Sequence, residues 1–337
     1  MSVQAAAGEG PAAGTSTLVR PTPSVPGAAI IVATVAWLGS AAITRLWPNA
    51  TEDWYYTEEL FYLKAAVAAV LLALAIVPGL ARPKRRARHS APWLIVLAVV
   101  FAVWEIVTAK IPLLPRPFFA PPQGLLEVYI DDWPRLVECV IASFLLLATG
   151  YLIGAVTGFI TGVAIGWSKI MGYWIHPVLR LIGPLPPVAW LPVAFFTFPS
   201  SWGASIFLIA LATAVPVTIL TWSGVSSVNS SLYDVARTMG ASRWFLVLRV
   251  AIPAAMPHVY VGLFMGMAAS FAVLVVAEMM GVKAGLGWYL QWALGWAAYA
   301  NMYAALLILA LLCSGLVTLL FKIRDRHLAW QKGLMKW

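Results

Sequence analysis

Two carboxylates in apolar runs are the residues of this sequence whose setting most favours chemistry. Glu105 stands within Trp104-Glu105-Ile106, and Glu278 within Ala277-Glu278-Met279. A carboxylate at the centre of a membrane helix costs about 2.5 to 3.5 kcal/mol on insertion scales, so each is expected to face a bundle interior or an interface. A carboxylate in such a place has one of two roles: it binds a proton or a sodium ion, or it stabilises a turn or a helix end. For Glu278 we favour the structural role.

Motifs for catalysis are missing from the sequence. It has no Gly-x-x-x-x-Gly-Lys-Ser/Thr phosphate loop, no Gly-x-Ser-x-Gly nucleophile elbow and no His-Glu-x-x-His zinc motif. Cys139 and Cys313 stand alone in apolar runs, outside any Cys-x-x-Cys spacing. We therefore expect no catalytic residue, no metal and no bound cofactor. If ATP and Mg²⁺ drive this protein, a separate subunit hydrolyses the ATP.

The segment 224–253 is the longest polar interruption in the second half of the chain. Ser231 and Asp234 have the spacing of a capping box, with Asp in place of the usual Glu, and Gly240 stands where a helix would end. The pattern predicts a short helix over 231–240 whose apolar side is formed by Leu232, Val235, Ala236 and Met239. Such a helix either docks a partner outside the membrane or is an ordinary amphipathic loop helix.

Four prolines within an uncharged run indicate a broken membrane helix: Pro184, Pro186, Pro187 and Pro192. Proline frees backbone carbonyls, which is tolerated at membrane depth only where the backbone faces protein or a wet cavity. Broken helices of this kind often line a substrate path, although a kink that serves packing alone has the same pattern. By position we expect solute to pass near Pro187, Trp190, Pro192, Thr213, Ser270 and Glu278.

The composition is that of an integral membrane protein. Of the 337 residues, 62% are hydrophobic and 10% are charged. The mean hydropathy of +0.86 lies far outside the range of soluble domains. A net charge of +9 would suit a nucleic-acid partner, but the placement of the charges indicates membrane topology instead. We expect lipid, and no nucleic acid, around this chain.

Eight apolar stretches are long enough to cross a membrane, given that a crossing needs about 20 residues. They span 28–44, 60–80, 91–109, 140–167, 176–198, 204–222, 254–277 and 302–321. The aromatic-rich stretch 288–299 is interpreted as a re-entrant or interfacial piece. It contributes to an aromatic belt that also suits a docked partner protein: Trp288, Tyr289, Trp292, Trp296, Tyr299 and Tyr303. Small residues every four positions, Gly262, Gly266 and Ser270, favour close helix packing within the chain or in a dimer.

Basic residues set the expected orientation. Of the 22 Lys and Arg residues, all but six fall on the side of the basic segment 82–88 and of the predicted helix at 231–240. Basic loops stay in the cytoplasm, so we expect both termini and that helix to be cytoplasmic. The six on the other side are Arg45, Lys64, Lys110, Arg116, Arg135 and Lys283.

The polar segment, the proline-rich run and two turns together resemble one protein family. Asp234, Ala236, Gly240, Val250, Ile252 and Pro253 are similar to the Glu-Ala-Ala signature of bacterial ABC import permeases. Asp234, Val235, Val250 and Ile252 depart from its usual residues, but the spacing from Gly240 to Pro253 is kept. The proline-rich run, Leu114-Pro115-Arg116-Pro117 and Gly285-Leu286-Gly287 resemble the nitrate, sulfonate, taurine and bicarbonate group of these permeases.

This resemblance, which covers about 91–321, implies an all-α integral membrane fold. It implies a type I ABC importer permease core of about six transmembrane helices, to which two N-terminal helices are added. The resemblance also implies cytoplasmic ATPase subunits, a second permease subunit as a homodimer, and an extracytoplasmic solute-binding protein, in the inner membrane. ATPase coupling would fall to Asp234, Val235, Ala236, Gly240, Ile252 and Pro253, and the solute would be a small anion.

The expected domain organisation follows from these assignments. It consists of a disordered tail (1–26), two added membrane helices (27–81), a basic connector (82–90), the permease domain (91–322) and a basic tail (323–337). A secondary carrier or channel driven by an ion gradient is the alternative function, with Glu105 and Glu278 as its ion sites. A membrane-bound enzyme is a third class, and the sequence supplies no catalytic group for it.

Overall fold

A computed structural model describes residues 28–51, 54–77, 81–111, 113–114 and 117–330. The expected disordered tail at 1–26 therefore lies outside the described residues, as do Pro115 and Arg116 of the Leu114–Pro117 turn. The described chain is all-helical. Its contacts divide it into two compact units: unit 1 holds the described residues up to 48 and those within 58–103, and unit 2 holds the described residues within 49–57 and from 104 onward.

Unit 1 is a bundle of three helices, α1 (Ala29–Leu46), α2 (Thr57–Ile76) and α3 (Ala81–Glu105). Their shared core is built from small and aliphatic side chains together with Trp37, whose ring packs 6.1 Å from that of Phe101. Lys64, assigned to the outer side by the charge pattern, is only 1% exposed and donates a hydrogen bond to Thr44 Oγ1 at 2.9 Å.

Helix α3 includes residues that the sequence assigned to two other segments. The expected basic connector at 82–90 is helical and forms the first turns of α3. Up to Val103 the helix groups with α1 and α2, although its apolar part was expected in the permease core. Helix propensity explains the first difference, because Lys, Arg and Ala are all good helix formers.

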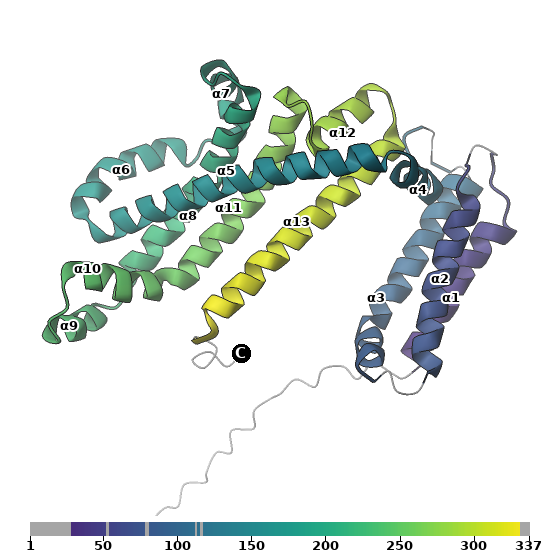
Figure 1. Ribbon diagram of the computed structural model, residues 1–337, viewed down its shortest axis with the longest axis horizontal. Helices are drawn as coiled ribbons and strands as arrows, with labels where there is room; N and C mark the ends of the chain where they lie inside the picture. The colour runs from purple at the N-terminus through teal and green to yellow at the C-terminus, as the bar shows by residue number, and fades with distance from the viewer. Residues whose placement is uncertain (1–27, 52–53, 78–80, 112, 115–116, 331–337) are drawn as a thin grey trace, which may run out of the picture. The chain divides into compact units, whose positions relative to one another are not determined.

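Unit 2 consists of long helices joined by short ones (Figure 1). Its elements after the π-helical turn η1 (Ile106–Lys110) are α4 (Pro122–Asp131), α5 (Trp133–Trp167), α6 (Lys169–Ile182), η2 (Pro187–Trp190), α7 (Leu191–Thr197), α8 (Ser201–Ser226), α9 (Ser230–Thr238), α10 (Arg243–Phe245), η3 (Leu246–Ala251), α11 (Ile252–Gly281), α12 (Leu286–Gly295) and α13 (Tyr299–His327). The basic tail expected from 323 thus continues α13 as far as His327, and 331–337 lie outside the described residues.

The core of unit 2 is α8 packed between α5 and α11. A glycine recurs every four residues along the α5 face that meets α8: Gly150, Gly154, Gly158, Gly162 and Gly166. A Cβ built on Gly154 would lie 2.4 Å from the carbonyl oxygen of Ala210, so the two backbones approach as closely as only glycine permits. On the other side of α8, Gly262 and Gly266 of α11 make the same kind of approach. The close packing expected of Gly262 and Gly266 is therefore found within the chain.

The expected fifth crossing, 176–198, is not a single helix. α6 is followed by η2 and α7 at an angle of 89°. Pro186, the residue before η2, has the extended backbone angles φ −61° and ψ 133°, because a residue that precedes a proline is driven out of the helical region. The chain therefore turns sharply at the proline cluster, as a broken span or a re-entrant segment.

Seven described helices are long and apolar enough to cross a membrane, and the count reaches eight if the bent pair is one span. The eight crossings expected from the sequence agree with this count. α12, at 10 residues, is too short to cross and fits the expected re-entrant or interfacial piece. α8 begins at the expected turn, where the Ser200 hydroxyl accepts a hydrogen bond from the Gly203 amide at 3.1 Å.

Candidate coupling and translocation site

The helix expected at 231–240 is α9, and its two ends are fixed by local hydrogen bonds. Asn229 is its N-cap and accepts from the Ser231 amide at 3.0 Å, so the expected capping box of Ser231 and Asp234 is wrong. At the other end the Gly240 amide donates to Arg237 O, and the Ala241 amide to Ala236 O. This is the Schellman arrangement, and it needs the φ of +81° that Gly240 adopts.

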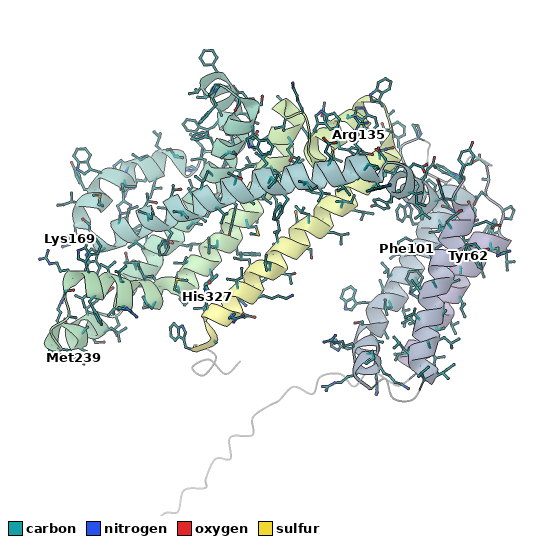
Figure 2. All side chains as sticks on the ribbon, in the orientation of Figure 1. Tyr62, Phe101, Arg135, Lys169, Met239 and His327 are labelled. Atoms are coloured by element: carbon teal, nitrogen blue, oxygen red, sulfur yellow. The ribbon has the colours of Figure 1, made fainter. Side chains whose placement is uncertain are left out.

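The outward face of α9 is apolar and open. Leu232, Val235 and Met239 are 50%, 61% and 83% exposed, and no residue of the helix is fully buried. Asp234 is also exposed and meets Arg237 in an i,i+3 ion pair at 3.2 Å. Met239 lies at the tip of α9, at the far end of unit 2 from α4 and α12 (Figure 2). An exposed apolar face of this kind is typical of a docking surface.

The inner side of α9 is rooted in the ends of three long helices. Tyr233 packs on the cluster formed by Val225 of α8, Ala251 and Ala255. Its ring also lies 5.8 Å from that of Trp167, the last residue of α5, in an edge-to-face contact. The predicted coupling residues Ile252 and Pro253 form the first turn of α11, directly after η3. A displacement of α9 would therefore act directly on α5, α8 and α11.

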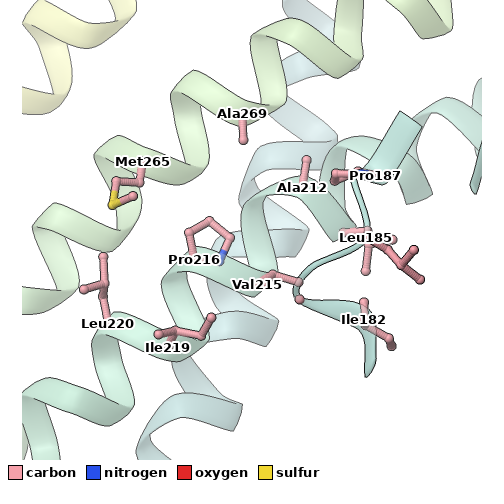
Figure 3. A pocket seen from close by; sticks show the side chains of 12 residues that line it. Ile182, Leu185, Pro187, Ala212, Val215, Pro216, Ile219, Leu220, Met265 and Ala269 are labelled. Atoms are coloured by element: carbon pink, nitrogen blue, oxygen red, sulfur yellow. The ribbon is translucent and has the colours of Figure 1, made fainter. Parts of the chain in front are cut away.

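A cavity of about 360 Å³ opens beside the proline bend (Figure 3). Pro187 and the bend line one side, α8 lines another through Val215 and Pro216, and α11 contributes Met265 and Ala269. Every lining side chain is apolar or absent. The lining of the cavity is thus apolar and has no charged group that would bind a solute tightly.

The predicted pathway residues divide into those near the cavity and those inside helix packing. Pro187 lines the cavity, whereas Trp190 is half-buried and Pro192 exposed along the η2–α7 segment. Thr213 and Ser270 are 0% exposed, and their hydroxyls donate to Ile209 O and Met267 O of their own helices. Thr213 is held between α5 and α11, because its side chain meets the positions of Gly154 and Gly266.

Glu278 lies in a closed hydrogen-bond network at the end of α11. Its side chain is 0% exposed, its Oε1 accepts from the Ser143 hydroxyl at 2.7 Å, and its Oε2 accepts from the Gly287 amide at 2.7 Å. Ser143 Oγ in turn accepts from the Leu286 amide at 2.8 Å. One carboxylate thus holds α5, α11 and the start of α12 together, which is the structural role favoured from the sequence.

The turn before α12 is shaped around this carboxylate. Gly285 has φ +145°, and a Cβ built there would lie 2.5 Å from the Glu278 carboxyl carbon. At Gly287 a Cβ would lie 2.6 Å from Val275 O. The Gly-x-Gly sequence is therefore required by the close approach of the turn to α11 and its carboxylate.

Glu105, the second intramembrane carboxylate of the sequence, is also buried and partnered. Gln123 Nε2 donates to its Oε1 at 2.8 Å, and the Lys110 ammonium lies 3.6 Å from the same oxygen. Lys110 also donates to Asn49 Oδ1 at 2.8 Å. Both carboxylates are thus engaged with the protein itself, which does not favour the carrier alternative.

Sequence reasoning missed two features of this region. The five α5 glycines have the spacing of a small-xxx-small stripe, so their signal was present in the sequence. The bond from Ser143 to Glu278 joins residues 135 positions apart, and no local pattern indicates it.

A protein-family model described as a binding-protein-dependent transport system inner membrane component matches residues 154–329. The nitrate import permease protein NrtB of Leptolyngbya laminosa is 30% identical over 69% of this chain and 84% of that protein. NrtB of Synechococcus elongatus is 28% identical over 74% of this chain and 95% of that protein. The bicarbonate transport system permease protein CmpB of Synechococcus elongatus is 31% identical over 58% and 67%.

Among solved structures, an inward-facing form of the MetNI methionine ABC transporter matches 57% of this chain and 94% of its own, at 18% identity and a TM-score of 0.47. The family match covers more than half of the chain, and several of its helices are long enough to cross a membrane. The chain is thus a multi-pass membrane protein that belongs to the family of binding-protein-dependent transport system inner membrane components, the permease subunits of ABC importers.

Proposed function

We propose that this chain couples ATP hydrolysis by separate cytoplasmic subunits to the inward movement of a small inorganic anion of the nitrate or bicarbonate class. The observation that carries the proposal is α9, a capped helix with an exposed apolar face that is rooted in the ends of α5, α8 and α11. The nitrate and bicarbonate permeases among its relatives support the solute class.

Energy enters this cycle through α9. ATP and Mg²⁺ bind the partner ATPases, whose closure displaces α9 and, through Tyr233, the helix ends packed on it. Close packing of glycines between α5 and α8 favours movement of these helices as one body. The permease then alternates between inward-facing and outward-facing forms. In this orientation α9 and both termini are cytoplasmic, as the distribution of basic residues indicates.

The apolar cavity at the proline bend is the proposed part of the solute path. The described wall of this cavity is formed by α6, η2, α8 and α11 of one subunit. In a dimer, a second copy of the chain would cover its open side. An anion meets no fixed positive charge there, so it passes without being held. Selection is then left to the extracytoplasmic solute-binding protein.

The test uses the permease purified with its ATPase subunits and reconstituted into liposomes. Replacement Val235→Glu or Met239→Glu places a charge on the docking face and should lower both ATPase co-purification and ATP-driven uptake at least about tenfold. Val235→Ala and Met239→Leu are matched controls that keep the face apolar and should retain most of both. Full uptake by both glutamate variants would contradict the coupling role of α9.

A further inference from the structure

The loop between α1 and α2 is fastened to unit 2. Residues 49–57 group with unit 2, although the helices on either side belong to unit 1. The Ala50 amide donates to Ala109 O at 2.9 Å, and Lys110 donates to Asn49 at 2.8 Å. Tyr56 donates its hydroxyl hydrogen to Asp131 Oδ1 at 2.7 Å. The added N-terminal segment therefore contributes a loop to the face of unit 2 formed by α4 and the start of α13.

Trp54 of this loop lines two adjoining cavities. Its ring lies against α4 at Gly124, where a built Cβ would be 3.0 Å from Trp54 Cζ3. We call the first cavity, of about 300 Å³, the aromatic cleft; it is lined by Trp54, Pro117, Phe119, Ala120 and residues 297–300. The second, of about 230 Å³, is the acidic cleft, lined by Trp54, Gly124, Glu127, Val128, Asp131, Asp132, Ala300 and Asn301. Trp54 and Ala300 are common to both.

Charge in the acidic cleft is negative. Asp131 and Asp132 accept hydrogen bonds from the hydroxyls of Tyr56 and Tyr289, which are uncharged donors. Burial and the nearby charge of Asp131 raise the pKa of the third carboxyl, Glu127. A positively charged side chain beside Trp54 would relieve this repulsion and gain a cation–π contact with the indole ring.

The backbone of the aromatic cleft is strained. Ala297 has φ +53°. Among the described residues it is the only one other than glycine with a positive φ. Alanine pays about 1 to 2 kcal/mol for that conformation, and such strain clusters at binding sites and switch regions. The rings of Phe118 and Tyr299 pack in a tilted arrangement with centroids 5.1 Å apart. The cleft is therefore a shaped aromatic hollow that is ready to receive an apolar side chain.

The geometry points to the two clefts, which share Trp54 of the α1–α2 loop, as a docking site for the solute-binding protein, which would insert an apolar side chain into the aromatic cleft and a Lys or Arg into the acidic one. Aromatic anchors beside paired charges are the usual energetic centre of protein interfaces. The site lies at the opposite end of unit 2 from α9, as a partner from the other side of the membrane requires. The inference rests on the proposed function, and it assigns a role to the added N-terminal segment.

The experiment measures binding of the purified, fluorescently labelled solute-binding protein to the permease–ATPase complex in nanodiscs. Trp54→Ala and Glu127→Lys should each raise the Kd about tenfold. Added salt should weaken binding to the wild-type complex, and the Glu127→Lys complex should lose most of this salt dependence. Tyr55→Ala is the matched control, because Tyr55 is the neighbouring aromatic residue, is 83% exposed and lines neither cleft. It should leave the Kd within about twofold.

The outcomes separate this inference from the proposed function. If the wild-type complex binds the solute-binding protein and both cleft variants bind it equally well, the docking site is wrong while the importer function stands. If the wild-type complex does not bind it, the proposed function fails first. Should Trp54→Ala misfold, Glu127→Lys and the milder Glu127→Gln carry the test. An effect confined to thermal stability would overturn docking and assign Trp54 to internal packing.

Discussion

The two ends of α11 complete their interactions in opposite ways. At its C-terminal end, Glu278 is fully buried and both of its oxygens accept hydrogen bonds from the same chain. At its N-terminal end the chain leaves large apolar side chains open, with Trp244 75% and Leu248 56% exposed. At the C-terminal end, the polar groups are therefore satisfied within the chain. The N-terminal end leaves these apolar side chains outside the packing of the chain, where lipid or a partner can cover them.

This difference separates stability from coupling along one helix. Buried polar groups that are fully paired are costly to disturb, so changes at the Glu278 end should act on the stability of the whole unit. Changes at the exposed end should act on partner binding and leave the isolated chain folded. The predictions below test whether the two ends can be perturbed independently.

The largest expected effect is that of Glu278→Ala. It leaves the Ser143 hydroxyl and the Gly287 amide without their acceptor and opens a cavity beside Gly285. We expect a loss of about 2 to 4 kcal/mol in the free energy of unfolding, because each orphaned buried donor costs about 1 to 3 kcal/mol. Thermal unfolding of the detergent-purified permease should show a clear fall in Tm.

Ser143→Ala is the milder variant, because it removes one donor to the carboxylate and the acceptor of the Leu286 amide but keeps the carboxylate and its bond from Gly287. It should lower the Tm by less than Glu278→Ala. In both variants, hydrogen exchange in α9 should be unchanged, since α9 lies at the far end of the helix. Increased exchange in α9 would show that the two ends are coupled in the isolated chain and would break the comparison.

The second prediction concerns the packing between the two ends. Gly154→Val places a branched side chain where even a Cβ meets Ala210 O at 2.4 Å, so α5 and α8 have to separate. Overpacking of this kind costs about 1 to 3 kcal/mol, and the Tm should fall accordingly. Gly315→Val on α13 is the matched control, because a Cβ there meets nothing within 4 Å. Equal Tm values for the two variants would contradict the close packing of α5 on α8.

Parts of this fold could be predicted from the sequence because they depend on local chemistry. The eight apolar stretches follow from membrane thickness, and the end of α9 follows from the one residue type that adopts a positive φ easily. The break at the proline cluster was also predictable from local chemistry, because proline interrupts a helix. Its angle of 89° was not, because several backbone paths satisfy the same prolines.

Which side of each long helix packs against its neighbours could not be predicted. α8 is apolar on all sides, so no periodic pattern distinguishes Thr213, which is buried in helix packing, from Val215 and Pro216, which line the cavity. The prediction of the N-cap of α9 was wrong for a different reason. Asn229 and Ser231 are both good N-cap residues, and only the backbone conformation decides between them. Contacts such as Ser143 with Glu278 depend on tertiary structure alone.

The smallest expected effect is that of Gly240→Ala at the exposed end. Alanine is less stable than glycine by about 1 to 2 kcal/mol in the left-handed conformation, so the Schellman end of α9 should fray while the rest of unit 2 stays intact. We expect faster hydrogen exchange in the last turn of α9, weaker co-purification of the ATPase and an unchanged Tm. Gly295→Ala, at a position outside the left-handed region and with nothing within 4 Å of its Cβ, is the matched control and should change none of the three. A fall in Tm for Gly240→Ala as large as that for Glu278→Ala would mean that α9 is part of the cooperative core. In that case its exposed apolar face would not be evidence for a missing partner.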